Sequence, residues 1–220
     1  MSPTRIALIH ALPHSVAPVN EVFQRDWPEC RRMNLLDDSL SADLARNGGL
    51  DDAMTQRFIA LADYAASTSV DAILFTCSAF GPCIDAVKQR LAPMPVLKPN
   101  EAMIDEAVAL QRARGGTVGL VASFGPTLQS MPPEFRPDVP LRSALAEGAL
   151  DALDRGDAQA HDRAAVRAAE VLAHGGCTVI ALAQFSLARA HDVIARATGL
   201  AVLTTPGSAV RALRQRLAAS

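Results

Sequence analysis

The segment at residues 71–81, Asp-Ala-Ile-Leu-Phe-Thr-Cys-Ser-Ala-Phe-Gly, constrains the fold more than any other part of the chain. Its residues 72–75 form a short apolar run, which is typical of a strand buried on both faces of a parallel sheet. The run ends in Thr-Cys-Ser, and a helical pattern begins at about residue 82. This order places Cys77 at the carboxyl end of a strand, where open α/β sheets bind ligands. The amides and dipole of the following helix favour its thiolate form.

Short apolar runs alternate with helical periodicity along the whole chain of 220 residues. Strands are predicted at residues 6–10, 32–36, 72–75, 95–97, 117–123, 139–142, 177–183 and 201–203. Helices are predicted at residues 15–26, 51–67, 82–92, 101–112, 157–173 and 187–197, with a last one opening at Pro206. The alternation predicts the α/β fold class with doubly wound parallel sheets.

The two halves of the chain repeat weakly. Residues 6–9 resemble residues 118–121 at an offset of 112 (118 − 6), and residues 72–78 align with 178–184 at an offset of 106 (178 − 72). The two offsets predict two similar Rossmann-like lobes related by pseudo-twofold symmetry, with the active site in a cleft between their carboxyl edges. The first lobe would comprise residues 1–98 and 206–220, and the second residues 99–205.

Composition excludes several classes of partner. The net charge is −2, and the chain lacks both an apolar run of membrane-spanning length and a signal-peptide pattern. We therefore expect a cytoplasmic protein with no nucleic-acid or membrane partner. The four cysteines fit neither a disulfide framework nor a zinc ribbon, so no metal is expected. Asp37 and Asp38 are interpreted as a loop. Nucleotide binding is disfavoured because no glycine-rich phosphate loop follows the first strand.

Two motifs, in this order and spacing, carry a resemblance that covers nearly the whole chain. The first is the strand that ends in Thr-Cys-Ser at residues 76–78, and the second is Gly-Leu-Val-Ala-Ser-x-x-Pro-Thr at residues 119–127. The chain resembles the aspartate/glutamate racemase superfamily, which includes hydantoin racemases, maleate isomerases and arylmalonate decarboxylases. The resemblance implies an isomerase or racemase that needs no cofactor and acts beside a carboxylate of a small acid. It also implies a homodimer.

Racemases of this family use two cysteines, one in each lobe. Cys177, within Gly-Cys-Thr, looks like the second one. However, it precedes its predicted strand, and six residues of strand place it about 20 Å from the carboxyl edge. The repeat alignment instead puts Ala183 at the second position. We therefore predict that Cys77 is the single catalytic thiol and that Cys177, like Cys30 and Cys83, is structural.

A single thiol leaves several reactions open. A two-base racemase removes a proton from one face and returns one to the other, which Ala183 cannot do. A lone thiol can protonate an enediolate after decarboxylation, as arylmalonate decarboxylases imply, although their cysteine belongs to the second lobe. It can also add to an activated alkene, as in half of the maleate isomerase reaction. An isomerase or racemase leads, with a decarboxylase second. A cysteine hydrolase or a non-catalytic small-acid binding protein are the alternatives of other classes.

Neutral donors are expected to bind the substrate carboxylate. Ser78 and the amide of Ala79 would form one oxyanion pocket, and a second set would face it from the other lobe. The family places substrate-contacting hydroxyls at Ser123 and Thr127. The second set consists of Ala183, Gln184, Phe185 and Ser186. Two polar residues predicted to end the first and second strands, His10 and Asn34, complete the candidates. The histidines on helices, His161, His174 and His191, are expected to face solvent.

Overall fold

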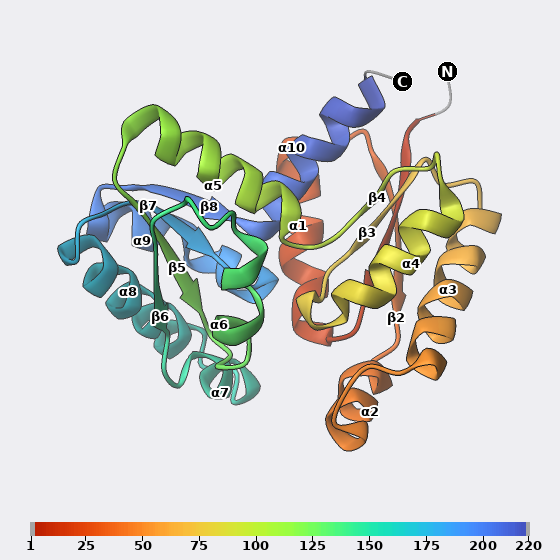
Figure 1. The fold of residues 1–220 in the computed structure, drawn as a ribbon, viewed down its shortest axis with the longest axis horizontal. Coiled ribbons are helices and arrows are strands. Elements are labelled where there is room, and N and C mark those ends of the chain that lie inside the picture. The colour runs from red at the N-terminus through yellow and green to blue at the C-terminus, as the bar shows by residue number, and fades with distance from the viewer. Residues whose placement is uncertain (1–2, 219–220) are drawn as a thin grey trace. The chain divides into compact units, whose positions relative to one another are not determined.

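The computed structural model describes residues 3–218 as two compact units (Figure 1). Unit 1 lies within Met1–Pro99 and Ala209–Ser220, and unit 2 is Asn100–Ser208. Each unit contains one four-stranded parallel sheet with helices packed on it. The predicted α/β fold class, with two parallel sheets, is confirmed. The cleft between two lobes stays a prediction.

The sheet of unit 1 has the strand order β2-β1-β3-β4. Its strands are β1 (Arg5–His10), β2 (Arg31–Leu36), β3 (Ala72–Phe75) and β4 (Val96–Leu97). Its helices are α1 (Val16–Asp26), α2 (Ser39–Asn47), α3 (Asp52–Ser67) and α4 (Gly81–Leu91), with the later turns of α10 (Thr205–Ala218). The four residues of β3 are all buried, as expected for a strand covered on both faces.

The sheet of unit 2 repeats this order as β6-β5-β7-β8. Its strands are β5 (Thr117–Ala122), β6 (Leu141–Leu145), β7 (Cys177–Leu182) and β8 (Ala201–Thr204). Its helices are α5 (Glu101–Arg114), α6 (Thr127–Ser130), α7 (Ala149–Asp154), α8 (Ala158–His174) and α9 (His191–Thr198). Matching order in both sheets means that β1 corresponds to β5 and β3 to β7.

Strand pairing fixes how residues correspond between the units, and it corrects one predicted offset. Ile9 pairs with Phe75 in unit 1, and Val121 pairs with Leu182 in unit 2. The first strands have six residues each, Arg5–His10 and Thr117–Ala122, and keep the predicted offset of 112 (117 − 5). With that offset, the pairings match the third strands at 107 (182 − 75) rather than 106. Short runs of similar apolar residues align almost equally well one residue apart, whereas backbone hydrogen bonds permit one register.

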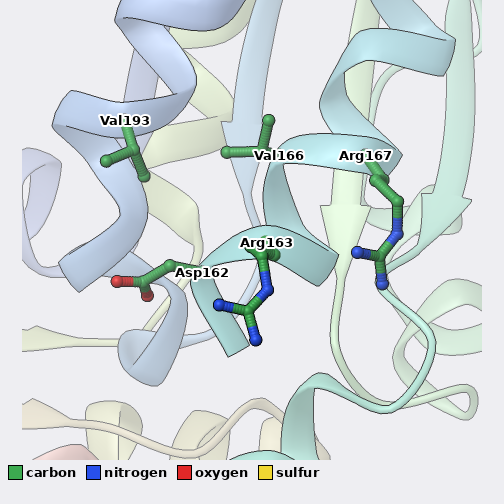
Figure 2. A pocket seen from close by; sticks show the side chains of 5 residues that line it. All are labelled: Asp162, Arg163, Val166, Arg167 and Val193. Atoms are coloured by element: carbon green, nitrogen blue, oxygen red, sulfur yellow. The ribbon is translucent and has the colours of Figure 1, made fainter. Parts of the chain in front are cut away.

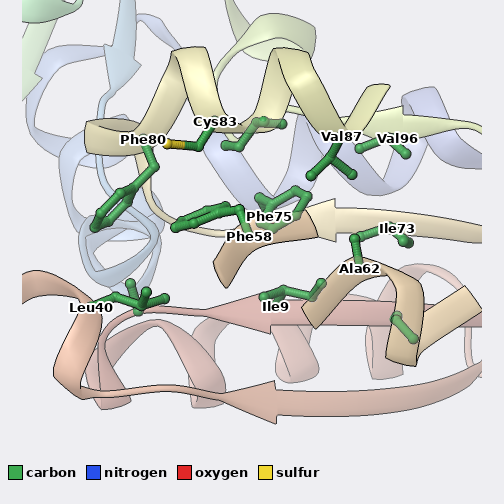
Figure 3. Close-up of a cluster of buried hydrophobic side chains, with 14 of the residues drawn as sticks. Ile9, Leu40, Phe58, Ala62, Ile73, Phe75, Phe80, Cys83, Val87 and Val96 are labelled. Carbon is green, nitrogen blue, oxygen red and sulfur yellow. The ribbon is translucent and has the colours of Figure 1, made fainter. Parts of the chain in front are cut away.

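The cores of the two units differ in the size of their side chains. In unit 1 the aromatic ring of Phe58 lies 5.4 Å from that of Phe75 and 4.8 Å from that of Phe80, measured between ring centroids (Figure 3). In unit 2 the corresponding cluster is built on the alanines of α8, with Leu182 and Leu187. Small side chains on α8 let this helix pack directly on its sheet.

Several local predictions are wrong in detail. Helix α1 begins at Val16, one residue later than predicted, and contains Pro18 in its first turn, where proline is tolerated. Helices α2, α6 and α7 were not predicted, and each has nine residues or fewer. Strand β6 begins two residues later than predicted, at Leu141. Residues 185–190 form a 3-10 helix rather than the start of α9. No helix in the described part of the chain is long and apolar enough to cross a membrane.

Candidate active site

Cys77 lies where the sequence predicts, immediately beyond the carboxyl end of β3. It has extended backbone angles (φ −127°, ψ 122°) and precedes a 3-10 turn, η2 (Ser78–Phe80), that leads directly into α4. Its side chain is half-buried and packs against the aromatic cluster of unit 1. The neighbouring Ser78 is also half-buried, and Ala79 is exposed. The thiol therefore lies on a turn that begins at the sheet edge, and its side chain packs against the cluster that contains Phe80.

The protonation of Cys77 differs from the sequence-based expectation. Burial raises the pKa of the Cys77 thiol above its usual range, and the backbone amide of Ala79 lowers it by less. The turn that follows is a single 3-10 turn, so fewer aligned amides face the sulfur than at the start of a long α-helix. At neutral pH Cys77 is thus a neutral thiol, which is a proton donor, rather than a standing thiolate.

A buried polar network fixes the residue that precedes Cys77. His10 Nδ1 lies 2.9 Å from Thr76 Oγ1 and 3.2 Å from Ser15 Oγ, and His10 Nε2 lies 3.0 Å from Asn34 Oδ1. Because Ser15 Oγ donates to the carbonyl of Leu12 and Asn34 Oδ1 can only accept, the network assigns the ring proton to Nε2. Thr76 then donates to Nδ1. Burial lowers the pKa of His10, so the ring is neutral.

This network corrects the predicted roles of His10 and Asn34. His10 is fully buried and both ring nitrogens are hydrogen-bonded, so it positions Thr76 and is not open to a ligand or to the Cys77 thiol. Asn34 does not end its strand: it pairs with Leu8, and β2 continues to Leu36. Its exposed side chain reaches back to His10, and its Oδ1 also accepts a hydrogen bond from Asn20.

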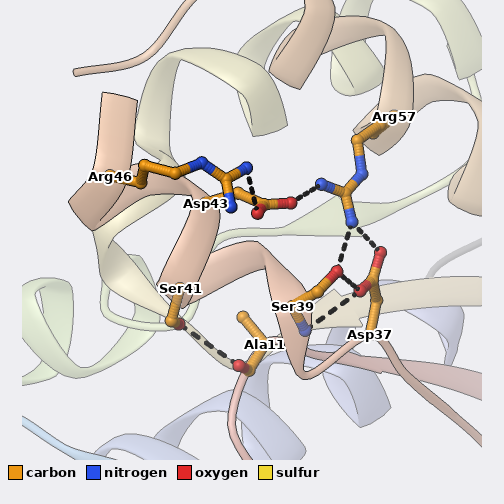
Figure 4. Close-up of polar contacts among 7 residues, drawn as sticks. All are labelled: Ala11, Asp37, Ser39, Ser41, Asp43, Arg46 and Arg57. Carbon is orange, nitrogen blue, oxygen red and sulfur yellow. Dashed lines mark hydrogen bonds and ion pairs between the residues drawn. The ribbon is translucent and has the colours of Figure 1, made fainter. Parts of the chain in front are cut away.

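An arginine holds the loop that follows β2 (Figure 4). Arg57 of α3 binds Asp37 at 2.6 Å and Ser39 Oγ at 2.8 Å, and it also pairs with Asp43 of α2. Burial alone would raise the pKa of Asp37, but the Ser39 hydroxyl and Arg57 outweigh it and leave that pKa lowered. Asp37 is therefore an ion-paired anchor of α2. In the described residues no three acidic, histidine or cysteine side chains are grouped to hold a metal ion.

At the matching strand end of unit 2 stands an amide. The hydrogen bond from Thr76 N to Ile9 O has its counterpart from Ala183 N to Val121 O. Gln184, not Ala183, therefore corresponds to Cys77, and it likewise precedes a 3-10 helix, η4 (Phe185–Ala190). This corrects the one-residue error of the repeat alignment. The prediction of a single catalytic thiol is unaffected by this correction, because glutamine, like alanine, has no titratable group.

Gln184 joins the two hydroxyl residues that the resemblance implied. Its Oε1 accepts a hydrogen bond of 2.8 Å from Ser123 N, and its Nε2 donates one of 2.7 Å to Thr127 Oγ1. Gln184 is half-buried, whereas Ser123 and Thr127 are buried. The structure therefore brings these three residues together at one strand end.

The other predicted residues of this edge are less accessible. Ala183 is buried in an apolar cluster with Leu203, so its side chain does not face a ligand. Phe185 and Ser186 are buried as well. Their burial follows from the 3-10 helix, which turns both side chains toward the interior. Of the predicted residues after β7, Gln184 thus offers the most accessible polar side chain.

Cys177 occupies the opposite end of β7 from Gln184. It is the first residue of the strand and is buried against α8. A side chain at Gly119 would lie within 3.2 Å of the Cys177 sulfur and of Leu172, and within 2.9 Å of Ile180. The sulfur therefore fills a tight internal space that a glycine on the neighbouring strand leaves open. Cys30 and Cys83 are also buried.

One histidine that was expected to face solvent is buried. His161 is fully buried; its Nδ1 lies 2.9 Å from Asp162 Oδ1, an oxygen that also accepts from Arg189 Nε. Its Nε2 has no hydrogen-bond partner among residues 3–218. Burial lowers its pKa, and Asp162 raises it by less. The sequence contains a signal for this burial: His161 lies four residues before Ala165, on the stripe of α8 that faces the core.

Unit 2 has a depression between two of its helices (Figure 2). It is lined by helical residues of α8 and α9: Asp162, Arg163, Val166, Arg167 and Val193. Arg163 and Arg167 are exposed on successive turns of α8. No residue of the candidate site lines this depression.

The observed architecture defines a class: two α/β units of equal strand order, with a cysteine at the carboxyl end of the third strand of the first. The sequence model of the Asp/Glu/Hydantoin racemase family matches residues 17–213. The chain therefore belongs to the Asp/Glu/Hydantoin racemase family. No curated protein sequence matches the chain.

Solved structures share the fold at low sequence identity. A glutamate racemase isoform from Bacillus anthracis superposes with a TM-score of 0.73 at 13% identity, covering 99% of this chain and 82% of that one. An allantoin racemase from Klebsiella pneumoniae gives 0.68 at 14% identity, covering 98% and 88%. A mutant of arylmalonate decarboxylase in a sulfate-associated form gives 0.59 at 16% identity, covering 96% and 92%.

Proposed function

We propose that this protein is a cofactor-independent enzyme of the racemase type that acts at the carbon next to the carboxylate of a small acid, with Cys77 as its acid–base group. The observation that carries the proposal is the position of Cys77: a half-buried thiol at the carboxyl end of β3, on a turn held by the His10–Thr76 network. Membership of the Asp/Glu/Hydantoin racemase family supports it.

The chemistry follows from the state of the thiol. A neutral Cys77 donates its proton to the carbon of an enediolate: the S–H bond breaks, the C–H bond forms, and a thiolate remains. In the reverse direction that thiolate removes the proton from the substrate carbon and becomes the thiol again. Ser78 and the amide of Ala79, next to the sulfur, would stabilise the charge that develops on the carboxylate oxygens.

A decarboxylase is the second candidate, and one observation favours it. The strand end of unit 2 that corresponds to Cys77 carries Gln184, whose amide is hydrogen-bonded to Ser123 and Thr127 and is neither an acid nor a base at neutral pH. Loss of carbon dioxide from a malonate-like acid needs a single proton donor, whereas two-base racemisation needs two groups.

Proton NMR in deuterium oxide with a panel of small carboxylic acids tests the proposal, because it reports both exchange of the α-proton and loss of carbon dioxide. Replacing Cys77 by alanine is expected to lower the rate by a factor of about 100 or more. The matched control is Cys177→Ala, the same change at the other end of the corresponding strand of unit 2, which should retain most activity. Full activity of C77A together with an inactive C177A would show that the assignment is wrong.

The pH dependence separates the two reactions. Exchange that begins with removal of a proton needs the thiolate, and burial raises the pKa of Cys77. The rate of exchange should therefore increase steadily toward alkaline pH. A decarboxylation that ends in proton donation needs the thiol, so its rate should hold at neutral pH and decline at alkaline pH.

A further inference from the structure

The depression between α8 and α9 of unit 2 carries two cations that have no partner in the described part of the chain. Arg163 and Arg167 lie four residues apart on α8, and both line the depression. Residues at this spacing are neighbours on one face of a helix, and Figure 2 shows both guanidinium groups extending from α8 in the same direction. Both side chains are exposed, and within residues 3–218 neither takes part in a hydrogen bond or ion pair. Both can therefore bind the same ligand.

Asp162 also lines the depression, but its charge is already neutralised. Asp162 Oδ1 accepts a hydrogen bond of 2.9 Å from Arg189 Nε, and Asp162 Oδ2 lies 3.4 Å from Arg189 Nη2. The ring of His161, which also contacts Asp162 Oδ1, is neutral because burial lowers its pKa. Arg189 thus balances Asp162, and the lining residues retain the two positive charges of Arg163 and Arg167. Such a surface attracts an anion with two negative charges.

Two valines give the depression an apolar wall. Val166 of α8 and Val193 of α9 are half-buried and line it from the two helices. Both pack against the core cluster of unit 2, so their positions are fixed. The volume of the depression, about 310 Å³, is at the lower end of the ~300–1,000 Å³ of small-molecule sites. The depression therefore offers a small ligand apolar contact beside two cations.

We propose that this depression binds a small phosphate monoester with an apolar organic group. The phosphate binds Arg163 and Arg167, and the organic group contacts Val166 and Val193. A phosphate monoester carries a charge of about −1.5 to −2 at pH 7, which matches two arginines, whereas a carboxylate matches one. The guanidinium group also has the geometry to bind two phosphate oxygens at once. Every residue of this site belongs to unit 2, and the proposed reaction uses none of them, so the proposal does not rest on the proposed function.

Calorimetric titration of the full chain with phenyl phosphate tests the proposal, and inorganic phosphate and phenol probe its two parts separately. Phenyl phosphate should bind more tightly than either of them. Arg163→Gln and Arg167→Gln should each weaken its binding about 10-fold, because each removes a charge-assisted hydrogen bond. Val193→Ala should weaken binding of phenyl phosphate about threefold or more and leave binding of inorganic phosphate unchanged, because only apolar contact is lost.

The matched control is Arg196→Gln, which changes an exposed arginine of α9 that does not line the depression and should leave binding unchanged. Phenyl phosphate bound elsewhere, for example at the strand end of Cys77, would keep its affinity in both variants of α8, and that result would overturn the proposal. An equal loss in Arg196→Gln, or no binding at millimolar phenyl phosphate, would overturn it as well. Equal affinity for phenyl phosphate and inorganic phosphate would show that the apolar group is not recognised. The three arginines are exposed, so these variants should fold, and thermal unfolding checks this.

Discussion

Units 1 and 2 share strand order and register but use different side chains at matched positions. Under the offset of 107, Phe58, Phe75 and Phe80 of unit 1 correspond to Ala165, Leu182 and Leu187 of unit 2. The strand end itself carries Cys77 in one unit and Gln184 in the other. The same strand order therefore carries a thiol packed on an aromatic cluster in unit 1 and an amide next to an aliphatic cluster in unit 2.

The strand ends also differ in what restrains them. In unit 1 the side-chain hydrogen bonds end at Thr76, one residue before the thiol, and the Cys77 sulfur interacts with the backbone amide of Ala79 and with apolar neighbours. In unit 2 the side chain of Gln184 is itself bonded at both ends, to Ser123 and Thr127. A reactive side chain needs a fixed backbone and a terminal group that can reach the substrate, whereas a structural side chain has its terminal group held by hydrogen bonds as well. This difference supports the proposal that the chemistry takes place at Cys77 of unit 1.

The largest effect is expected from a substitution in the phenylalanine cluster of unit 1. Phe58 contacts both other rings of the cluster and is fully buried, so Phe58→Ala should lower the free energy of unfolding by about 3–5 kcal/mol. Chemical denaturation measures it. The comparison variant in the core of unit 2 is Leu187→Ala, at the position that corresponds to Phe80; it removes a smaller side chain and should cost about 2–5 kcal/mol. If Phe58→Ala lowers the free energy of unfolding by less than Leu187→Ala does, the proposed difference between the two cores is wrong.

A smaller effect concerns the buried histidine of each unit. Burial lowers the pKa of both His10 and His161, so the unfolded chain binds protons that the folded chain does not. Stability should therefore be fully present above about pH 6.5 and decline as the pH falls further, by up to about 1.4 kcal/mol per pH unit for each histidine. Denaturation at pH 7 and pH 5 measures the slope.

Single substitutions assign that slope to each unit. His10→Asn and His161→Asn should each reduce the dependence of stability on pH. A slope that survives both buried substitutions would mean that other groups titrate on unfolding.

The smallest effect tests the restraint on Gln184. Gln184→Ala leaves Ser123 N and Thr127 Oγ1 without their partner and should lower stability by about 1–2 kcal/mol. If the amide is structural, the rate of turnover per folded molecule should change far less than in C77A. Loss of activity as complete as in C77A, at unchanged stability, would instead assign chemistry to unit 2.

Much of this architecture could be predicted from the sequence because it depends on local patterns. The apolar run at residues 72–75 and its Thr-Cys-Ser ending determine a buried strand and place Cys77 at its edge. The position of Cys177 before a strand determines, by strand length alone, that it lies at the other end. Apolar periodicity and strand rise are properties of a few neighbouring residues, so no tertiary information is needed.

Tertiary structure decided what depends on residues far apart in the chain. Backbone pairing of Val121 with Leu182 set the register and put Gln184, rather than Ala183, at the position of unit 2 that corresponds to Cys77. Contacts across 66 residues enclosed His10 with Thr76, and packing of α8 on its sheet buried His161. Burial also raised the pKa of Cys77, although the sequence alone favours a thiolate. Register, burial and the pKa values that follow from burial are collective, because each is set by how distant segments pack.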